Sequence, residues 1–218
     1  MQQDEMWAVQ YGSYGGPEVL TIGSTPKPKV GRGEVLVEVS GFSLNNVDVE
    51  KRRGKMKGVN GFGFPKGIGV DFAGVVADVG EGANRWRIGD RVWGYLGIKP
   101  CGESGAAAQY VAVRPNKIAH APTNISIQEA AAFPLAGLTA LQALRDTLKV
   151  EPGQRTLVVG GSGGVGSTAV QVAAALGAEV DAVVGSQASV ATKAGANRIF
   201  DYHSVTPDDI AERYDAIL

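Results

Sequence analysis

The sequence predicts an α/β protein, with a β-rich domain over residues 1–125 and a parallel α/β sheet over residues 126–218. Three observations lead to this prediction. Up to about Ala119, short β-type segments are separated by glycine-rich turns. After Asn124, apolar residues recur at helical spacing, and strands then alternate with helices. A glycine-rich turn connects the first of those strands to its helix.

The first domain is predicted from segments with strand character. Val35, Val37 and Val39 occupy alternate positions, so they can face a common core. Further strands are expected over residues 70–79, after Gly89, and over residues 109–113. These short strands between tight turns are typical of a small, irregular β-barrel.

Helices and strands of the second domain are predicted from caps and periodicity. Ser126 followed by Glu129 is a capping box and should start a helix. A second helical segment is predicted from the regular spacing of Leu141, Leu144 and Leu148. A strand is expected at 156–159, and a helix after it is predicted from one apolar stripe: Val165, Ala169, Val172, Ala173 and Leu176. Later strands are expected at 180–184, 198–200 and 216–218.

Composition excludes several classes of function. The formal net charge of −1 gives no electrostatic reason to expect nucleic acid or an anionic membrane as a partner. No apolar run is long enough to span a membrane. Cys101 is the only cysteine, so neither an internal disulfide nor a cysteine cluster for zinc can form. A reducing compartment, most simply the cytoplasm, is expected.

The glycine-rich turn is the strongest functional signal from the residues alone. Gly161-Ser162-Gly163-Gly164-Val165-Gly166 fits the G-x-G-x-x-G pattern, leaves a buried strand and opens a helix. Glycines permit the tight turn and a close approach of the backbone to a pyrophosphate, and the helix N-terminus offers free N–H groups. A dinucleotide site is therefore predicted, with a βα turn that binds no ligand as the alternative.

The end of the next strand bears on the choice of cofactor. An acid that binds the ribose of NAD is expected there, but the residues are Gly185-Ser186-Gln187. Asp181 lies in the middle of the strand and is interpreted as a strand residue. The missing acid leaves room for a 2′-phosphate, which favours NADPH.

Several further motifs resemble, in order, those of the quinone oxidoreductase branch of the medium-chain dehydrogenase/reductase superfamily. Among them are Tyr14-Gly15-Gly16-Pro17-Glu18-Val19-Leu20, Leu44-Asn45-Asn46-Val47-Asp48, Gly69-Val70-Asp71-Phe72-Ala73-Gly74-Val75-Val76 and Pro134-Leu135-Ala136-Gly137-Leu138-Thr139-Ala140. The resemblance implies a GroES-like catalytic domain followed by a Rossmann domain, with NAD(P)H bound between them.

The resemblance also assigns roles to single residues. Zinc-dependent relatives carry a cysteine at the position of Asn45 and Gly-His-Glu at 69–71, so no zinc site is expected. Asn45 would lie near the nicotinamide and donate to a developing oxyanion, or it is a turn-capping residue. Asp48 is interpreted as a turn or cap residue. Thr139 resembles a threonine that contacts the cofactor, with a helix-start hydroxyl as the alternative.

The resemblance places Tyr202 beside the adenosine 2′-phosphate and Ser186 where a phosphate-binding hydroxyl is expected. Other positions depart from the family pattern. Met56 stands where several relatives carry a tyrosine, which puts a tyrosine proton donor in doubt. The basic run from Lys51 to Lys57 is expected to be a solvated loop.

The expected function is hydride transfer from NADPH to a quinone, an enone or another activated carbonyl compound, without zinc. A zinc-free alcohol or aldehyde reductase is an alternative, and so is a non-catalytic protein that binds NADPH or a partner on the same fold. Full-length relatives commonly dimerise, so the resemblance implies a homodimer. Residues 216–218 enter a fourth strand, so the Rossmann sheet is expected to be incomplete and this chain alone to bind cofactor weakly and turn over poorly.

Overall fold

The computed structural model describes residues 4–61, 63–97, 105–185, 187–210 and 213–218. The chain forms two compact units, Met1–Leu135 and Ala136–Leu218. This division falls later than the change of sequence pattern near residue 125. The reason is that helix α2 (Ile127–Ala130) packs against strands of the first unit, where Ala130 and Ala131 share a buried cluster with Ala73.

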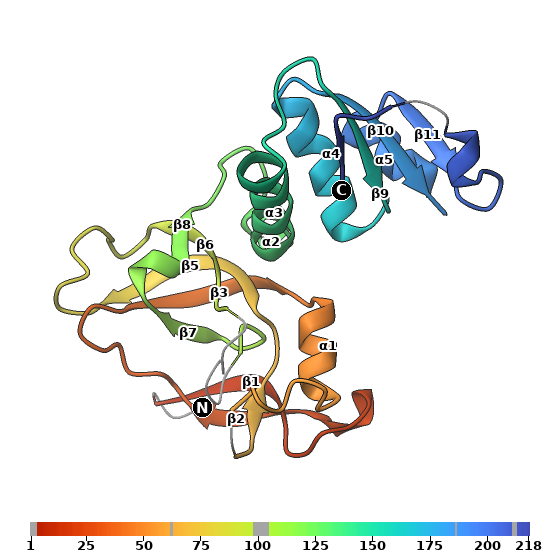
Figure 1. The fold of residues 1–218 in the computed structure, drawn as a ribbon. Coiled ribbons are helices and arrows are strands. Elements are labelled where there is room, and N and C mark those ends of the chain that lie inside the picture. Colours follow the sequence, from red (N-terminus) through yellow and green to blue (C-terminus); the bar gives the residue numbers. More distant parts are fainter. Residues whose placement is uncertain (1–3, 62, 98–104, 186, 211–212) are drawn as a thin grey trace. The chain divides into compact units, whose positions relative to one another are not determined.

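Two antiparallel sheets build the first unit (Figure 1). A three-stranded sheet has the order β2-β1-β4, and a five-stranded sheet has the order β7-β3-β5-β6-β8. The strands are β1 (Glu5–Tyr11), β2 (Leu20–Pro26), β3 (Val35–Ser43), β4 (Lys66–Gly67), β5 (Asp71–Val79), β6 (Arg91–Tyr95), β7 (Tyr110–Val113) and β8 (Ile118–His120). The short helices are η1 (Pro17–Val19), α1 (Asn46–Arg52) and η2 (Pro115–Lys117).

The main core of the first unit lies on one face of β3 and β5. Val35 and Val37 of β3 are fully buried, together with Phe72 of β5, as the alternation in the sequence predicts. Strands β3 and β5 pair along their whole lengths, so Ser43 at the end of β3 lies opposite Asp71 at the start of β5. This pairing places two polar residues, far apart in the sequence, at the same corner of the sheet.

A parallel four-stranded sheet of order β11-β10-β9-β12 forms the second unit. Its strands are β9 (Arg155–Val159), β10 (Glu179–Val184), β11 (Arg198–Asp201) and β12 (Ala216–Ile217). Its helices are α3 (Pro134–Leu141), which begins in the first unit, η3 (Gln142–Thr147), α4 (Gly164–Ala175), α5 (Ala188–Ala194) and η4 (Pro207–Asp209). Numbered from β9, the order 3-2-1-4 is that of a Rossmann sheet, which confirms the predicted fold class.

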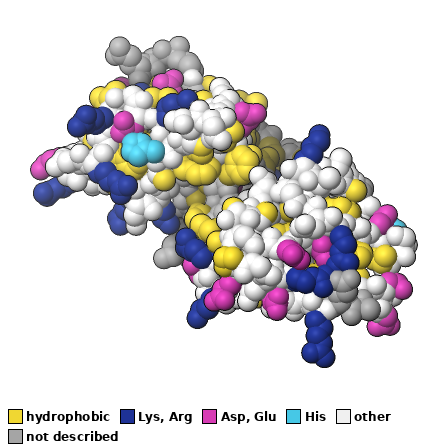
Figure 2. Space-filling model, turned by 90° about the horizontal axis from the view of Figure 1, so that it is seen from above, with side chains coloured by type: hydrophobic (Ala, Val, Ile, Leu, Met, Phe, Trp, Pro, Cys, Tyr) yellow, Lys and Arg dark blue, Asp and Glu magenta, His cyan; other side chains and the backbone are white. Residues whose placement is uncertain are grey.

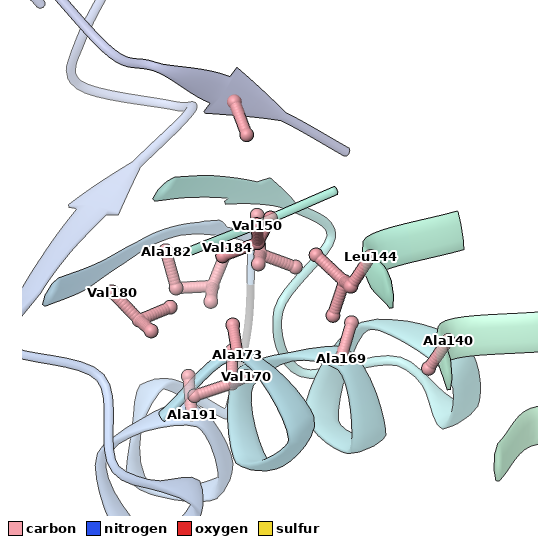
Figure 3. Packing of buried hydrophobic residues seen from close by; sticks show 12 residues of the cluster. Ala140, Leu144, Val150, Ala169, Val170, Ala173, Val180, Ala182, Val184 and Ala191 are labelled. Carbon is pink, nitrogen blue, oxygen red and sulfur yellow. The ribbon is translucent and has the colours of Figure 1, made fainter. Parts of the chain in front are cut away.

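Helices α4 and α5 cover one face of this sheet (Figure 3). Val180, Ala182 and Val184 alternate along β10 and point toward the helices, where they meet Val170 and Ala173 of α4. Most of the side chains in this core are alanine and valine, and their small size allows the helices to lie close to the strands.

Two predicted apolar positions are wrong. Val165 is 38% exposed in the first turn of α4, so it does not join the core as Ala169 and Ala173 do. Leu148 is 36% exposed, whereas Leu144 is fully buried. The segment Gln142–Thr147 is a π-helix, in which the N–H of Leu148 bonds to the carbonyl of Ala143. The wider turn moves Leu148 off the apolar stripe that a regular α-helix would have formed.

Charged side chains of both signs are interspersed on the face seen in Figure 2. Lysine and arginine do not gather there into a continuous positive surface of the kind that binds nucleic acid. Within the ranges that the structure describes, no helix has the length and apolar character needed to cross a membrane.

Candidate functional site

The glycine-rich turn lies at the carboxyl end of β9 and leads directly into α4. Gly160 has a positive φ of 80°, which bends the chain sharply after the strand. The turn then passes so close to itself that a Cβ on Gly166 would lie 2.0 Å from the carbonyl oxygen of Gly160. A Cβ on Gly161 would lie 2.7 Å from the Cβ of Ala182 in β10. Glycine at 161 and 166 is therefore required by close packing of the turn against helix and strand.

The N-terminus of α4 can accept an anionic group. Gly163 is its N-cap residue, and no side chain caps the helix. Gly163, Gly164 and Val165 are exposed, and a Cβ on Gly164 would meet nothing within 4 Å. The first N–H groups of the 12-residue helix thus face open space with the positive end of the helix dipole behind them. This arrangement fits the pyrophosphate of a dinucleotide.

Tyr202 lies at the same edge of the sheet as the glycine turn. It follows β11, and its N–H bonds to the carbonyl of Val184, the last residue of β10. A Cβ on Gly185 would come within 2.3 Å of the Tyr202 ring, so the ring lies directly against the backbone at the end of β10. The ring is 60% exposed and is available to a ligand. Ser186, the other predicted residue here, lies outside the described residues.

Asp181 belongs to an ion-pair cluster on β10. Its carboxylate accepts hydrogen bonds from Arg198 at 2.6 Å and 3.1 Å, from the Tyr214 hydroxyl at 2.8 Å, and from Arg155 at 3.4 Å. Burial acts to raise the pKa of Asp181, but the bonds from Arg198 and Tyr214 and the charge of Arg198 outweigh it and lower the pKa. The interpretation of Asp181 as a strand residue, rather than a ribose ligand, agrees with these contacts.

Asn45 lies in the first unit as the N-cap residue of α1, two residues after the end of β3. Its side-chain amide donates a hydrogen bond of 2.9 Å to Oδ2 of Asp71. The same oxygen accepts the hydroxyl of Ser43 at 3.1 Å, and Oδ1 of Asp71 accepts the N–H of Leu135 at 3.0 Å. Asp71 is fully buried, whereas Asn45 is partly exposed. The Asn45 side chain is therefore held from behind by a buried acid.

Asp48 stabilises the chain around Asn45. Its carboxylate accepts the backbone N–H of Asn45 at 2.8 Å and that of Gly69 at 3.1 Å, which confirms a capping role. Burial raises the pKa of both Asp48 and Asp71, more than their hydrogen bonds lower it, and the charge of Asp48 adds to the rise at Asp71. Two buried carboxyl groups thus support one short segment of backbone.

Thr139 is exposed on α3, so its hydroxyl is accessible. The remaining predicted residues fall into two groups. The glycine turn and Tyr202 both lie at the carboxyl edge of the Rossmann sheet, and Asn45 lies in the first unit. Asp71 was not singled out from the sequence. An acid at the start of a buried strand is a signal, but its contact with Asn45 depends on strand register.

A zinc site like that of the zinc-dependent relatives would need ligands at the positions of Asn45 and Val70. Val70, at the position where zinc-dependent relatives carry a histidine, is fully buried and apolar. Among the residues that the structure describes, no three histidine, cysteine or acidic side chains are grouped as a metal site would require.

Comparison with known proteins gives consistent matches. Residues 31–123 match the alcohol dehydrogenase GroES-like domain. The chain is 34% identical to an NADPH-dependent alkenal/one oxidoreductase of Arabidopsis thaliana, and the match covers 98% of this chain and 56% of that protein. It is 33% identical to a chloroplastic quinone oxidoreductase of Triphysaria versicolor, over 98% of the chain and 67% of that protein.

A solved structure agrees with these relatives. The quinone oxidoreductase of Escherichia coli, complexed with NADPH, superposes with a TM-score of 0.80 at 32% identity, over 92% of this chain and 60% of that one. The chain thus spans between about half and two thirds of the length of the proteins it matches. On the fold, the glycine turn and these similarities, the chain belongs to the quinone oxidoreductase branch of the medium-chain dehydrogenase/reductase superfamily.

Proposed function

We propose that this protein is an NADPH-dependent reductase of quinones or activated alkenes that works without zinc. The observation that carries the proposal is the uncapped N-terminus of α4 at the glycine turn, with Tyr202 exposed at the same edge of the sheet. The names of the relatives point in the same direction, since they include an NADPH-dependent alkenal/one oxidoreductase and quinone oxidoreductases.

In this proposal each residue of the cofactor site has a separate task. The N–H groups of Gly164 and Val165 bind the pyrophosphate. The N–H of Gly163 donates to the carbonyl of Gly160, so Gly163 acts with Gly161 and Gly166 to keep the turn tight enough to present the other two. Tyr202 and Ser186 bind the adenosine end with its 2′-phosphate. Thr139 contacts the nicotinamide end. Bound NADPH supplies the hydride, and the protein determines its orientation and excludes competing reactions.

Asn45 is the proposed electrophilic group. An amide N–H held in place can stabilise the negative charge that develops on the substrate oxygen when a hydride arrives. The flanking residues Phe42 and Leu44 are 40% and 55% exposed, although both are apolar. Exposed apolar side chains beside a hydrogen-bond donor suit an apolar ring or enone better than a charged substrate.

A screen of NADPH oxidation over quinones, enones, aldehydes and alcohols or ketones tests the proposal. We expect slow but measurable turnover with quinones or enones, no loss of activity after treatment with a zinc chelator, and no stoichiometric zinc in the purified protein. Turnover restricted to aldehydes or ketones would favour the alcohol or aldehyde reductase instead. NADPH binding without oxidation by any acceptor would favour a non-catalytic binding protein.

A further inference from the structure

One acid, Asp71, accepts the hydrogen bonds that surround the inner end of the Asn45 side chain. Asp71 accepts from three donors that come from different parts of the first unit: the Ser43 hydroxyl at the end of β3, the Asn45 amide at the start of α1, and the Leu135 backbone N–H in α3. Asp71 is 0% exposed, so water cannot replace any of these partners easily.

The chemistry of Asp71 determines how the Asn45 amide is turned. An ionised carboxylate accepts hydrogen bonds and donates none. An asparagine side chain can be rotated so that either its oxygen or its nitrogen faces a neighbour, and an acceptor-only neighbour selects the nitrogen. With one N–H of Asn45 bonded to Asp71, the second N–H of the same nitrogen has a fixed direction.

We propose that Asp71 is a positioning residue, which orients the Asn45 amide so that its second N–H donates to the reacting oxygen of the substrate. The inference rests on the proposed role of Asn45 and adds the residue that orients it. Asp71 itself touches no substrate because it is fully buried. A group whose rotamer is fixed by such a buried partner gives more effective stabilisation than one that must reorient during the reaction.

The purely structural alternative is that Asp71 only ties β3, α1 and α3 together. An exchange of the two side chains separates the alternatives. In Asn45→Asp/Asp71→Asn, the amide of residue 71 donates to the carboxylate of residue 45, so the hydrogen bond returns with its direction reversed. The double variant has no side-chain N–H at position 45 that could donate to a substrate.

The wild-type protein, Asp71→Asn and the exchanged double variant are compared for thermal stability and for kcat and KM. We expect Asp71→Asn to lower kcat by about 10-fold, with a smaller change in the KM for NADPH. The reason is that the Asn45 side-chain amide is then free to rotate, so that its oxygen can take the place of its nitrogen. The exchanged double variant should regain thermal stability lost in Asp71→Asn, yet keep a low kcat. Recovery of both stability and kcat in the double variant would overturn the proposal, as would a normal kcat in Asp71→Asn.

A measurement that needs no turnover keeps the inference separate from the proposed function. In ¹H–¹⁵N spectra, assigned with Asn45→Ala, one side-chain amide proton of Asn45 should be shifted downfield and exchange slowly with solvent. Ser43→Ala, which removes a different partner of the same Asp71 oxygen, should preserve that signal. Two rapidly exchanging Asn45 protons in the wild-type protein would overturn the inference, even if no variant of Asp71 folds. If the signal is present but no acceptor oxidises NADPH, the proposed function fails while the orientation of Asn45 by Asp71 stands.

Discussion

At the scale of single residues, the glycine turn depends on distances more than on backbone angles. Gly166 does not have a positive φ, yet a Cβ there would lie 2.0 Å from the carbonyl oxygen of Gly160. Gly164, two positions earlier, has open space where its Cβ would be. A methyl group would therefore clash with the backbone at Gly166 but not at Gly164, although both glycines belong to one motif.

Replacement of these two glycines by alanine tests the difference. Gly166→Ala should lower the free energy of unfolding by about 1–3 kcal/mol, because helix and turn must separate, and should weaken NADPH binding. Gly164→Ala is the matched control and should not destabilise the protein, since the added methyl meets no atom within 4 Å. Chemical unfolding and cofactor titration measure both effects. Equal stability of the two variants would contradict the close-packing explanation.

The role of Asn45 leads to a second prediction. Asn45→Ala should lower kcat/KM by roughly 10- to 100-fold, or about 1.4–2.8 kcal/mol, because one donor to the developing charge is lost. NADPH affinity should change much less. Asn46→Ala, at the exposed neighbouring position, serves as control. Steady-state kinetics decide, and unaltered turnover in Asn45→Ala would leave Asn45 as a helix cap alone.

The sequence predicted these site residues unequally. The glycine turn could be identified because its function is local: strand, turn and helix follow one another in the chain. The contact between Asn45 and Asp71 could not, since it depends on the register of β3 against β5 across a separation of 26 residues. Lys51 and Arg52 were expected in a solvated loop, but they are buried in α1, where Arg52 bonds to the carbonyl of Gly15.

At the scale of elements, the predicted helices and strands largely agree with the structure. The capping box of Ser126 and Glu129 is present, with the Glu129 N–H bonded to the Ser126 hydroxyl at 3.1 Å. Strands at the predicted places lie in the five-stranded sheet of the first unit and in the parallel sheet of the second, whereas the three-stranded sheet β2-β1-β4 was not predicted. The irregular elements are those that local patterns miss: the π-helix after α3 is a rare element, and the helical spacing of Leu141, Leu144 and Leu148 predicts a regular α-helix instead.

The Rossmann sheet is also joined by the Asp181 cluster, which connects three strands and the entry to β12. Because the pKa of Asp181 is lowered in the folded protein, its ionised form stabilises the fold above the usual pKa of 3.8, and that stability is lost as the pH falls through the folded value. The charged and hydrogen-bonding groups that face Asp181 are Arg155, Arg198 and Tyr214.

Asp181→Asn tests this cluster. We expect the free energy of unfolding at neutral pH to fall by about 1–3 kcal/mol, because bonds to a charged acceptor are weakened while both arginines remain. The variant should also lose less stability than the wild-type protein as the pH falls below about 4. Asp146→Asn, which removes an exposed pair with Arg145, should change little. If the wild-type protein and Asp181→Asn lost the same free energy of unfolding as the pH falls below about 4, the stabilising role of ionised Asp181 would be contradicted.

At the scale of the whole molecule, the motifs run in family order along the chain, and the match to relatives extends over 98% of it. This agreement is why the sequence predicted the two-part architecture well. The association of two copies and a cytoplasmic location stay predictions. Light scattering on the purified protein tests the first, where the mass of two chains is expected and that of one chain would exclude a stable dimer.

The choice of cofactor tests the central claim most directly, because it depends on the glycine turn and the end of β10 together and needs no substrate. NADPH and NADH are titrated separately onto the wild-type protein, and binding is followed by fluorescence. We predict that NADPH binds several-fold tighter, since no acid stands at Gly185 and the exposed Tyr202 ring lies beside it. Equal or tighter binding of NADH would contradict the account.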